Sequence, residues 1–456
     1  MGDLHHQAPQ EPIIQDLKVS IQDSSLIIPP HQTHDNNNQN KSIFLSNIDQ
    51  VLNFHVQTLH FFQANPDFPP ETAAASLKNG LEKLMAGPYD FLAGRLKPNH
   101  QTGRLEIECN GMGAGFVVAS SEYSLDEIGD LVYPNPGFMQ LIVPGLEKFL
   151  DQPLGVFQVT SFKCGSFALG VSTNHILFDG MSFKTFLQNL ASQSLPDDRP
   201  LAAVPCNDRR LLAARSPPRV TFPHPELQKL DLLDEQNDPP PVFNCSQADL
   251  DFRIFHLSPD NISRLKTKAG PTKATGFNAV AALVWRCKAL SSMSHDRESV
   301  ILYAVDIRQR LVPPLPAAYC GNAVLSAHAS ASCPELADEA FGETVRRVAA
   351  GAARMTDEYA RSVIDWGELH KGFPHGEFLI SSWWRLGFDE VGYPWGMAKY
   401  SCPVVYPRKD IVLLFPEMRV GDGGSSGGGG GVNVLAALPP DEMEKFSSLF
   451  HEYISG

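Results

Sequence analysis

The amino-acid sequence predicts an α/β protein built from two domains. The chain has 456 residues, more than a single hydrophobic core usually organises, so we expect two large domains. Segments with apolar residues at every second position alternate with segments that have them three and four residues apart. A charged, proline-rich stretch at 196–226 has neither period and is expected to cross the surface between the domains.

These patterns give domain boundaries. We expect one domain over 41–195 and a second over 227–456. Residues 1–40 are polar and rich in Asn, Gln and His, which indicates a mobile arm that supplies at most a short strand. The glycine-rich residues 421–431 are expected to form a flexible loop between two strands of a hairpin.

The individual elements follow from the same two periods. Alternation or apolar character predicts strands at 104–111, 115–120, 155–162, 165–175, 252–257, 301–307, 322–330, 376–383, 411–418 and 432–438. Helical spacing predicts helices around Leu81, Leu187, Val280 and Phe446. The predicted helix around Val280 begins after Thr275, a residue type that caps helix N-termini.

Composition and the absence of certain motifs argue against several functional classes. The formal net charge of −14 leaves no overall attraction for a phosphate backbone, so we expect no nucleic-acid partner. We also expect no membrane span and no signal peptide, and therefore a cytoplasmic protein. The eight cysteines contain no Cys-x-x-Cys pair and are expected to be reduced thiols, and no metal-binding, serine-hydrolase or dinucleotide motif is present.

The stretch NHILFDGMSF, residues 174–183, joins a predicted strand to a predicted helix. His175 lies at the end of the strand, where an imidazole suits proton abstraction near neutral pH. The same pattern also fits a histidine that is simply packed in a core turn. Asp179 occupies the position of a helix N-cap, which is a structural role.

Several motifs resemble one family, the plant BAHD acyl-CoA-dependent acyltransferases. HILFDG at 175–180 matches the His-x-x-x-Asp-Gly motif of that family. LSNID, YDFLAGRL, FNAVAALVWRCKAL, VDIRQRLVPPLPAAYCGNA and SSWWRLGFDEVGYPWG resemble it in family order over nearly the whole chain. The last two of these blocks look most like the hydroxycinnamoyl-transferring members, including those that acylate long-chain alcohols or ω-hydroxy acids.

The resemblance implies roles for particular residues. His175 would be the general base, and the indole of Trp395 would donate to the oxyanion of the tetrahedral intermediate. Asp179 would brace the turn against Arg308 or Arg310, although both arginines also fit solvated surface charges. Gly180 and Gly396 would support the site. Lys273 and Thr275 would contact CoA, whereas Lys266 and Lys268 fit a solvated helix face better.

One motif departs from the family pattern. The Asp-Phe-Gly-Trp-Gly motif aligns with residues 392–396, where Gly392 replaces the aspartate and Asp389 is the nearest alternative carboxylate. This loss gives some weight to a second hypothesis, a non-catalytic accessory protein that binds acyl-CoA or a partner enzyme. The intact HILFDG favours the enzyme.

The resemblance implies a fold of two similar-sized domains with mixed sheets flanked by helices, and a channel between them that contains His175. A monomer would transfer an acyl group from CoA to an alcohol or amine, with no permanently bound cofactor and no metal.

Overall fold

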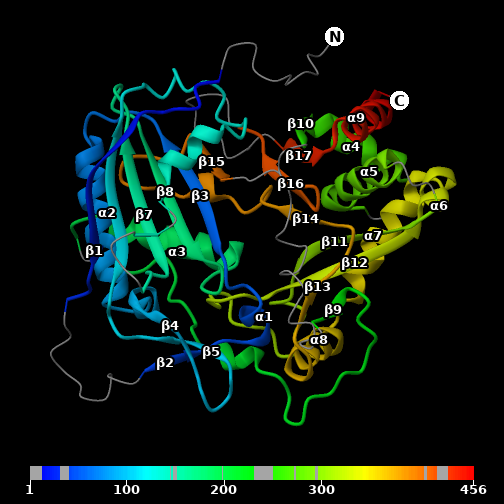
Figure 1. Cartoon of the computed structure of the whole chain (residues 1–456), viewed down its shortest axis with the longest axis horizontal. Helices are drawn as coiled ribbons and strands as arrows, with labels where there is room; N and C mark the ends of the chain where they lie inside the picture. The colour runs from blue at the N-terminus through cyan, green and yellow to red at the C-terminus, as the bar shows by residue number, and fades with distance from the viewer. Residues whose placement is uncertain are drawn as a thin grey trace.

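The computed structural model describes residues 13–30, 41–143, 145–146, 151–197, 199–230, 250–271, 274–292, 296–404, 408–418 and 430–455. Within these residues, two six-stranded sheets lie side by side, each with helices packed against it (Figure 1). Both sheets mix parallel and antiparallel neighbours, so the predicted α/β class with mixed sheets is confirmed.

The first sheet carries the strand that leads to His175. Its strands, in spatial order, are β1 (Val19–Ile27), β6 (Ala114–Ser121), β7 (Gly155–Ser161), β8 (Phe167–Asn174), β3 (His55–Phe62) and β15 (Tyr400–Pro403). Helices α2 (Pro70–Met85) and α3 (Gly180–Gln193) pack together beside this sheet (Figure 1). Their apolar faces meet side chains of β8 such as Phe167 and Leu169 in one buried cluster.

The second sheet forms the other half of the molecule. Its strands, in spatial order, are β10 (Asp251–Leu257), β17 (Val432–Leu438), β16 (Ile411–Pro416), β14 (Phe378–Ser382), β11 (Glu298–Asp306) and β12 (Val324–Ser332). Its helices are α4 (Pro259–Lys268), α5 (Gly276–Ser291), α6 (Cys333–Asp338), α7 (Phe341–Arg354), α8 (Asp357–Leu369) and α9 (Pro440–Ser455).

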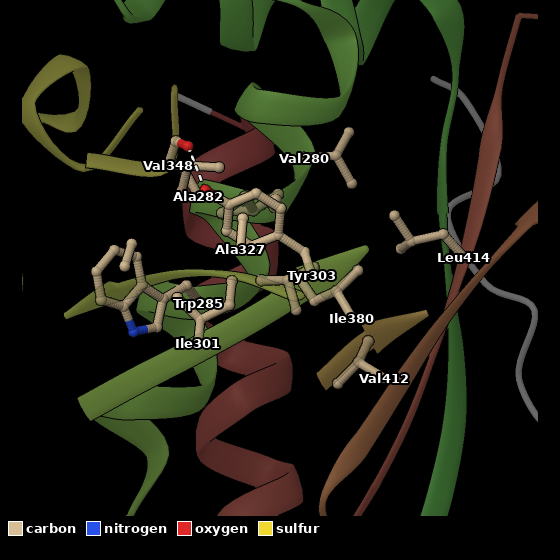
Figure 2. Packing of buried hydrophobic residues seen from close by; sticks show 14 of the residues in the cluster. Val280, Ala282, Trp285, Ile301, Tyr303, Ala327, Val348, Ile380, Val412 and Leu414 are labelled. Atoms are coloured by element: carbon tan, nitrogen blue, oxygen red, sulfur yellow. Dashed lines mark hydrogen bonds between the residues drawn. The ribbon is translucent and has the colours of Figure 1, made fainter. Parts of the chain in front are cut away.

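The core of this half lies between α5 and its sheet. Figure 2 shows Trp285 and Val280 of α5 over Ile301 and Tyr303 of β11. The polar groups of Trp285 and Tyr303 have partners, because the Trp285 indole donates to Ser299 Oγ at 3.0 Å and the Tyr303 hydroxyl donates to the Val348 carbonyl. The packing therefore buries large aromatic rings without leaving these polar atoms unsatisfied.

Short elements complete the chain. They are α1 (Asn47–Gln50), the three-stranded sheet of β2 (Ser42–Phe44), β5 (Leu105–Glu108) and β4 (Arg95–Pro98), the pair β9 (Leu227–Lys229) and β13 (Gly372–Pro374), and the 3₁₀ turns η2 (Asp90–Ala93), η3 (Pro136–Leu141), η4 (Arg209–Leu212) and η6 (Phe388–Glu390).

The two sheets do not follow the predicted domain boundaries. Strand β15 lies in the C-terminal segment 227–456, yet it pairs with β3 in the first sheet. Strand β1 lies in the segment 1–40, pairs with β6 and is nine residues long, which is longer than the short strand expected there. Edge strands are recruited by unpaired main-chain groups, and these can come from any part of the sequence.

Side-chain contacts attach the predicted crossover, residues 196–226, to the second half of the molecule. Arg215 forms ion pairs with Asp365 at 2.6 Å and Glu358 at 2.9 Å, and so links the crossover to α8. The predicted glycine-rich loop connects the antiparallel neighbours β16 and β17, as a hairpin requires. Most of that loop, residues 421–429, lies outside the described residues.

Candidate active site

His175 follows the last residue of β8, in a tight turn that ends at helix α3. Its amide donates to the Phe54 carbonyl at 2.7 Å, and the Phe54 ring stands edge-on to the imidazole at 5.3 Å. The amides of Ile176 and Leu177 both donate to Asn174, one to the side chain and one to the main chain, at 3.1 and 3.0 Å. The strand therefore ends in a turn that its own last residue closes.

The imidazole is set between protein and solvent. His175 is partly exposed, but its Nδ1 is buried and has no hydrogen-bond partner among the described residues. Burial lowers the pKa of His175, while its own carbonyl and the carboxylate of Asp179 oppose this shift without cancelling it. The ring is consequently neutral at pH 7, which is the state that a general base requires.

Asp179 has the structural role that its position predicts. Its side chain accepts from the Ser182 amide at 2.9 Å and caps helix α3. The same carboxylate is buried and forms a two-point ion pair with Arg308 at 2.8 and 2.9 Å. Of the two arginines considered, Arg308 is therefore the partner, whereas Arg310 donates to the carbonyls of Ala352 and Met355.

Gly180 is the first residue of α3, and the side chain of Leu386 lies close to its backbone. A Cβ atom at this position would come within 2.7 Å of the Leu386 side chain. Glycine thus allows the segment after β14 to pack against the start of the helix that follows the His175 turn.

The structure does not bring Trp395 to His175. The Trp395 ring stacks on Tyr393 at 5.0 Å and meets Phe167, the first residue of β8, at 5.8 Å. His175 follows the other end of the same strand, about 26 Å away at roughly 3.3 Å per residue. The proposal that the Trp395 indole stabilises an oxyanion beside His175 is therefore wrong, and the residue is part of the aromatic core of the first half.

Gly396 belongs to the Trp395 end of the molecule as well. It is exposed, has a φ of +122°, and closes a turn through two hydrogen bonds with Tyr393. It supports that turn and not the surroundings of His175. Gly392, where the family aspartate is missing, is exposed in the same segment, and a Cβ atom there would meet nothing within 4 Å.

The two residues predicted to contact CoA have different outcomes. Thr275 is exposed and accepts from the Asn278 amide at 3.1 Å, which makes it the N-cap of α5 as predicted. Lys273 lies outside the described residues. On α4, Lys268 stands over the ring of Tyr453 at 5.1 Å, which agrees with a surface role for that helix face.

Sequence reasoning missed a second set of buried charges behind the His175 turn. Asp49 of α1 and Arg209 of η4 form an ion pair at 3.3 Å with both side chains almost fully buried. Asn322 donates through its Nδ2 to Asp49 Oδ1 and to the His175 carbonyl, both at 2.8 Å. Asp49 and Asn322 lie within motifs that resemble the family, but Arg209 lies in the stretch predicted to be surface crossover, where no sequence signal marks burial.

Among the described residues, no cluster of three or more His, Cys, Asp or Glu side chains is placed to hold a metal ion. In the same part of the chain, no helix has both the length and the apolar character needed to cross a bilayer.

Two mixed six-stranded sheets thus meet near the turn that carries His175, and the Asp179–Arg308 ion pair joins the two halves there. The model of the Transferase family matches residues 17–453. The chain belongs to this family, and the resemblance to the BAHD acyl-CoA-dependent acyltransferases is confirmed. The prediction of an acyl-CoA-dependent O-acyltransferase is thereby confirmed at the level of the family.

Individual relatives agree with this assignment. The chain is 55% identical to acyltransferase GLAUCE of Arabidopsis thaliana, over 99% of both chains. It is 31% identical to two other Arabidopsis proteins, the omega-hydroxypalmitate O-feruloyl transferase (95% of this chain and 93% of that one) and the fatty alcohol:caffeoyl-CoA acyltransferase (89% and 93%). The crystal structure of vinorine synthase shares the fold, with a TM-score of 0.71 and 22% identity over 94% of this chain and 98% of the other.

Proposed function

We propose that this chain transfers a hydroxycinnamoyl group from CoA to the hydroxyl of a long-chain aliphatic acceptor, with His175 as general base. The observation that carries the proposal is the His175 turn itself. The turn that carries this imidazole is held by side chains from both halves of the molecule, because Asp179 pairs with Arg308 and Asn322 donates to the His175 carbonyl.

The chemistry needs only this base and the two substrates. His175 takes the proton of the acceptor hydroxyl as its oxygen attacks the thioester carbonyl. The tetrahedral intermediate collapses, the carbon–sulfur bond breaks, and the imidazolium returns the proton to the CoA thiolate. Asp179 takes no part in proton transfer, because both of its oxygens already accept from Arg308 and main-chain amides.

The substrate classes rest on the relatives and the CoA contact on the helix geometry. Two relatives combine a hydroxycinnamoyl donor with a long aliphatic acceptor in their names. For CoA, we propose the N-terminus of α5, where Thr275 is exposed and the helix dipole favours phosphate, together with Lys273 nearby in sequence. Local positive charge is needed because the chain as a whole is acidic.

The alternative of a non-catalytic accessory protein rested on the missing aspartate at Gly392. That position is exposed and belongs to the segment around Trp395, far from the His175 turn. Its replacement therefore gives the accessory role no structural support.

The proposal is tested with purified protein, feruloyl-CoA or caffeoyl-CoA, and a C16 alcohol. Acceptor-dependent release of free CoA thiol is expected, and His175→Ala should lower the rate about 10²–10⁴-fold. His100→Ala, at an exposed histidine in a turn, serves as the matched control and should keep the wild-type rate. Unchanged turnover in His175→Ala would refute the base, and silence across a broad acceptor panel would favour the accessory role.

A further inference from the structure

The buried ion pair of Asp49 and Arg209 lies next to the pair of Asp179 and Arg308, because Asp49 and Asp179 accept from the consecutive amides of Asn322 and Ala323. Asp49 comes from α1, Arg209 from the crossover and Asn322 from the segment before β12, so three distant parts of the chain converge here. All three side chains are buried, and the guanidinium of Arg209 also lies over the Phe91 ring at 5.9 Å.

Asn322 and Arg209 donate hydrogen bonds to three consecutive main-chain carbonyls. Asn322 Nδ2 donates to the His175 carbonyl at 2.8 Å. Arg209 donates through Nη1 to the Ile176 carbonyl and through Nη2 to the Leu177 carbonyl, the latter at 2.8 Å. Every carbonyl of the turn from 175 to 177 thus receives a donor from this group, and none of these donors comes from the turn itself.

Asp49 orients the side chains of Asn322 and Arg209. Its Oδ1 accepts from the Asn322 amide and side chain at 3.2 and 2.8 Å and faces Arg209, while its Oδ2 accepts from the Ser46 amide and hydroxyl at 2.9 and 2.8 Å. Buried ion pairs add little to stability compared with apolar packing of the same volume, because desolvating both charges is costly. An arrangement of this kind is better explained by the geometry that it imposes.

We propose that Asp49, Arg209 and Asn322 are positioning residues that fix the backbone of the His175 turn and thereby aim the imidazole at the substrates. This inference rests on the proposed function of His175 and adds a role for the crossover, whose Arg209 reaches the site from outside both sheets. Arg308 and Asp179 hold the start of the helix that follows, so one buried ion pair supports the turn and a second supports the helix after it.

Two variants test the proposal through catalysis. Asn322→Ala removes the donor to the His175 carbonyl, and Arg209→Lys keeps the charge but cannot serve two carbonyls in the same way. We expect kcat to fall about 10–100-fold with the KM for both substrates within about threefold, because a misplaced base slows the chemical step without altering binding. Asn322→Ser, which retains one donor, should give an intermediate kcat and serves if Asn322→Ala fails to fold.

Matched controls separate positioning from stability. Asn433→Ala removes a buried amide that donates to the Pro416 carbonyl in the second sheet, and Arg210→Lys changes the exposed arginine next to Arg209. Both controls should keep the wild-type kcat, even where Asn433→Ala lowers the melting temperature as much as Asn322→Ala does. Equal losses of kcat in Asn433→Ala and Asn322→Ala would overturn the proposal.

A second readout does not depend on turnover. The rate at which diethyl pyrocarbonate modifies His175, followed by peptide mass spectrometry across pH, reports the pKa and accessibility of the ring. In Arg209→Lys the midpoint should rise toward 6.5, because a loosened turn lets water reach the imidazole. Asn322→Ala is left out of this readout, because Asn322 itself raises the pKa of His175. A wild-type midpoint in folded Arg209→Lys would refute the positioning role, whereas a wild-type protein without turnover would refute only the proposed reaction.

Discussion

Arg308 and Asp179 form a buried, two-point ion pair across 129 residues of sequence, at 2.8 and 2.9 Å. The pair joins the loop after β11, in the second half of the molecule, to the first turn of α3 in the first half. Because Asp179 also caps α3, one carboxylate sets both the end of the His175 turn and its attachment to the other half.

Breaking this pair should cost stability. In Arg308→Ala the Asp179 charge stays buried without its cation, so we expect the free energy of unfolding to fall by about 3–5 kcal/mol in urea titrations. Arg310→Ala is the matched control. It removes hydrogen bonds to two carbonyls and no ion pair, and should cost about 1 kcal/mol. Similar losses in the two variants would contradict a special role for the pair.

Replacing Trp395 should affect stability more than catalysis. The Trp395 ring packs on Phe167 at the far end of β8, so Trp395→Phe is expected to keep kcat within about threefold of wild type. The smaller ring leaves a cavity in the aromatic cluster and should lower the melting temperature. A 10²-fold loss of kcat in steady-state assays, with the protein still folded, would restore a catalytic role for the indole.

The pH dependence of the reaction follows from the pKa of His175. The reactive form is the neutral imidazole, and burial places the pKa below 6.5. Therefore kcat/KM should be level above about pH 6.5 and fall tenfold per pH unit below the pKa. Asp179→Asn removes a negative charge that raises this pKa, so the midpoint should move to a lower pH. A midpoint above 6.5 in the wild-type profile would contradict the effect of burial.

The two glycines near Trp395 should respond differently to substitution. Gly392→Asp restores the family residue at an exposed position with open space, so stability should change by less than about 0.5 kcal/mol and activity should persist. Gly396→Ala forces a side chain onto a φ of +122° and should cost about 1–3 kcal/mol in thermal or urea unfolding. A sharp loss of both stability and activity in Gly392→Asp would show that the segment has been rebuilt around the glycine.

Local sequence patterns predicted most strands of the two sheets and several of the helices. The alternation before His175 predicted β8, and the helical spacing around Leu187 predicted α3, because each period follows from the geometry of one element. Asp179 was identified as a helix cap for the same reason, since a cap is satisfied within one turn. The motif resemblance supplied the family and offered Arg308 or Arg310 as the partner of Asp179, and the structure shows that the partner is Arg308.

What the sequence by itself determined is most strands of the two sheets, the helices α2, α3, α5 and α9, the position of His175 at the end of a strand, and the family. Strands β3 and β15 and the helices α4, α7 and α8 were not predicted. Tertiary structure alone decided that β15 joins the first sheet, that Trp395 lies a strand length from His175, and that Arg209 is buried behind the turn. The physical reason is the sequence separation of the interacting residues. Periodicity and capping are properties of neighbouring residues, whereas strand pairing and buried ion pairs depend on which distant segments pack together and exclude water.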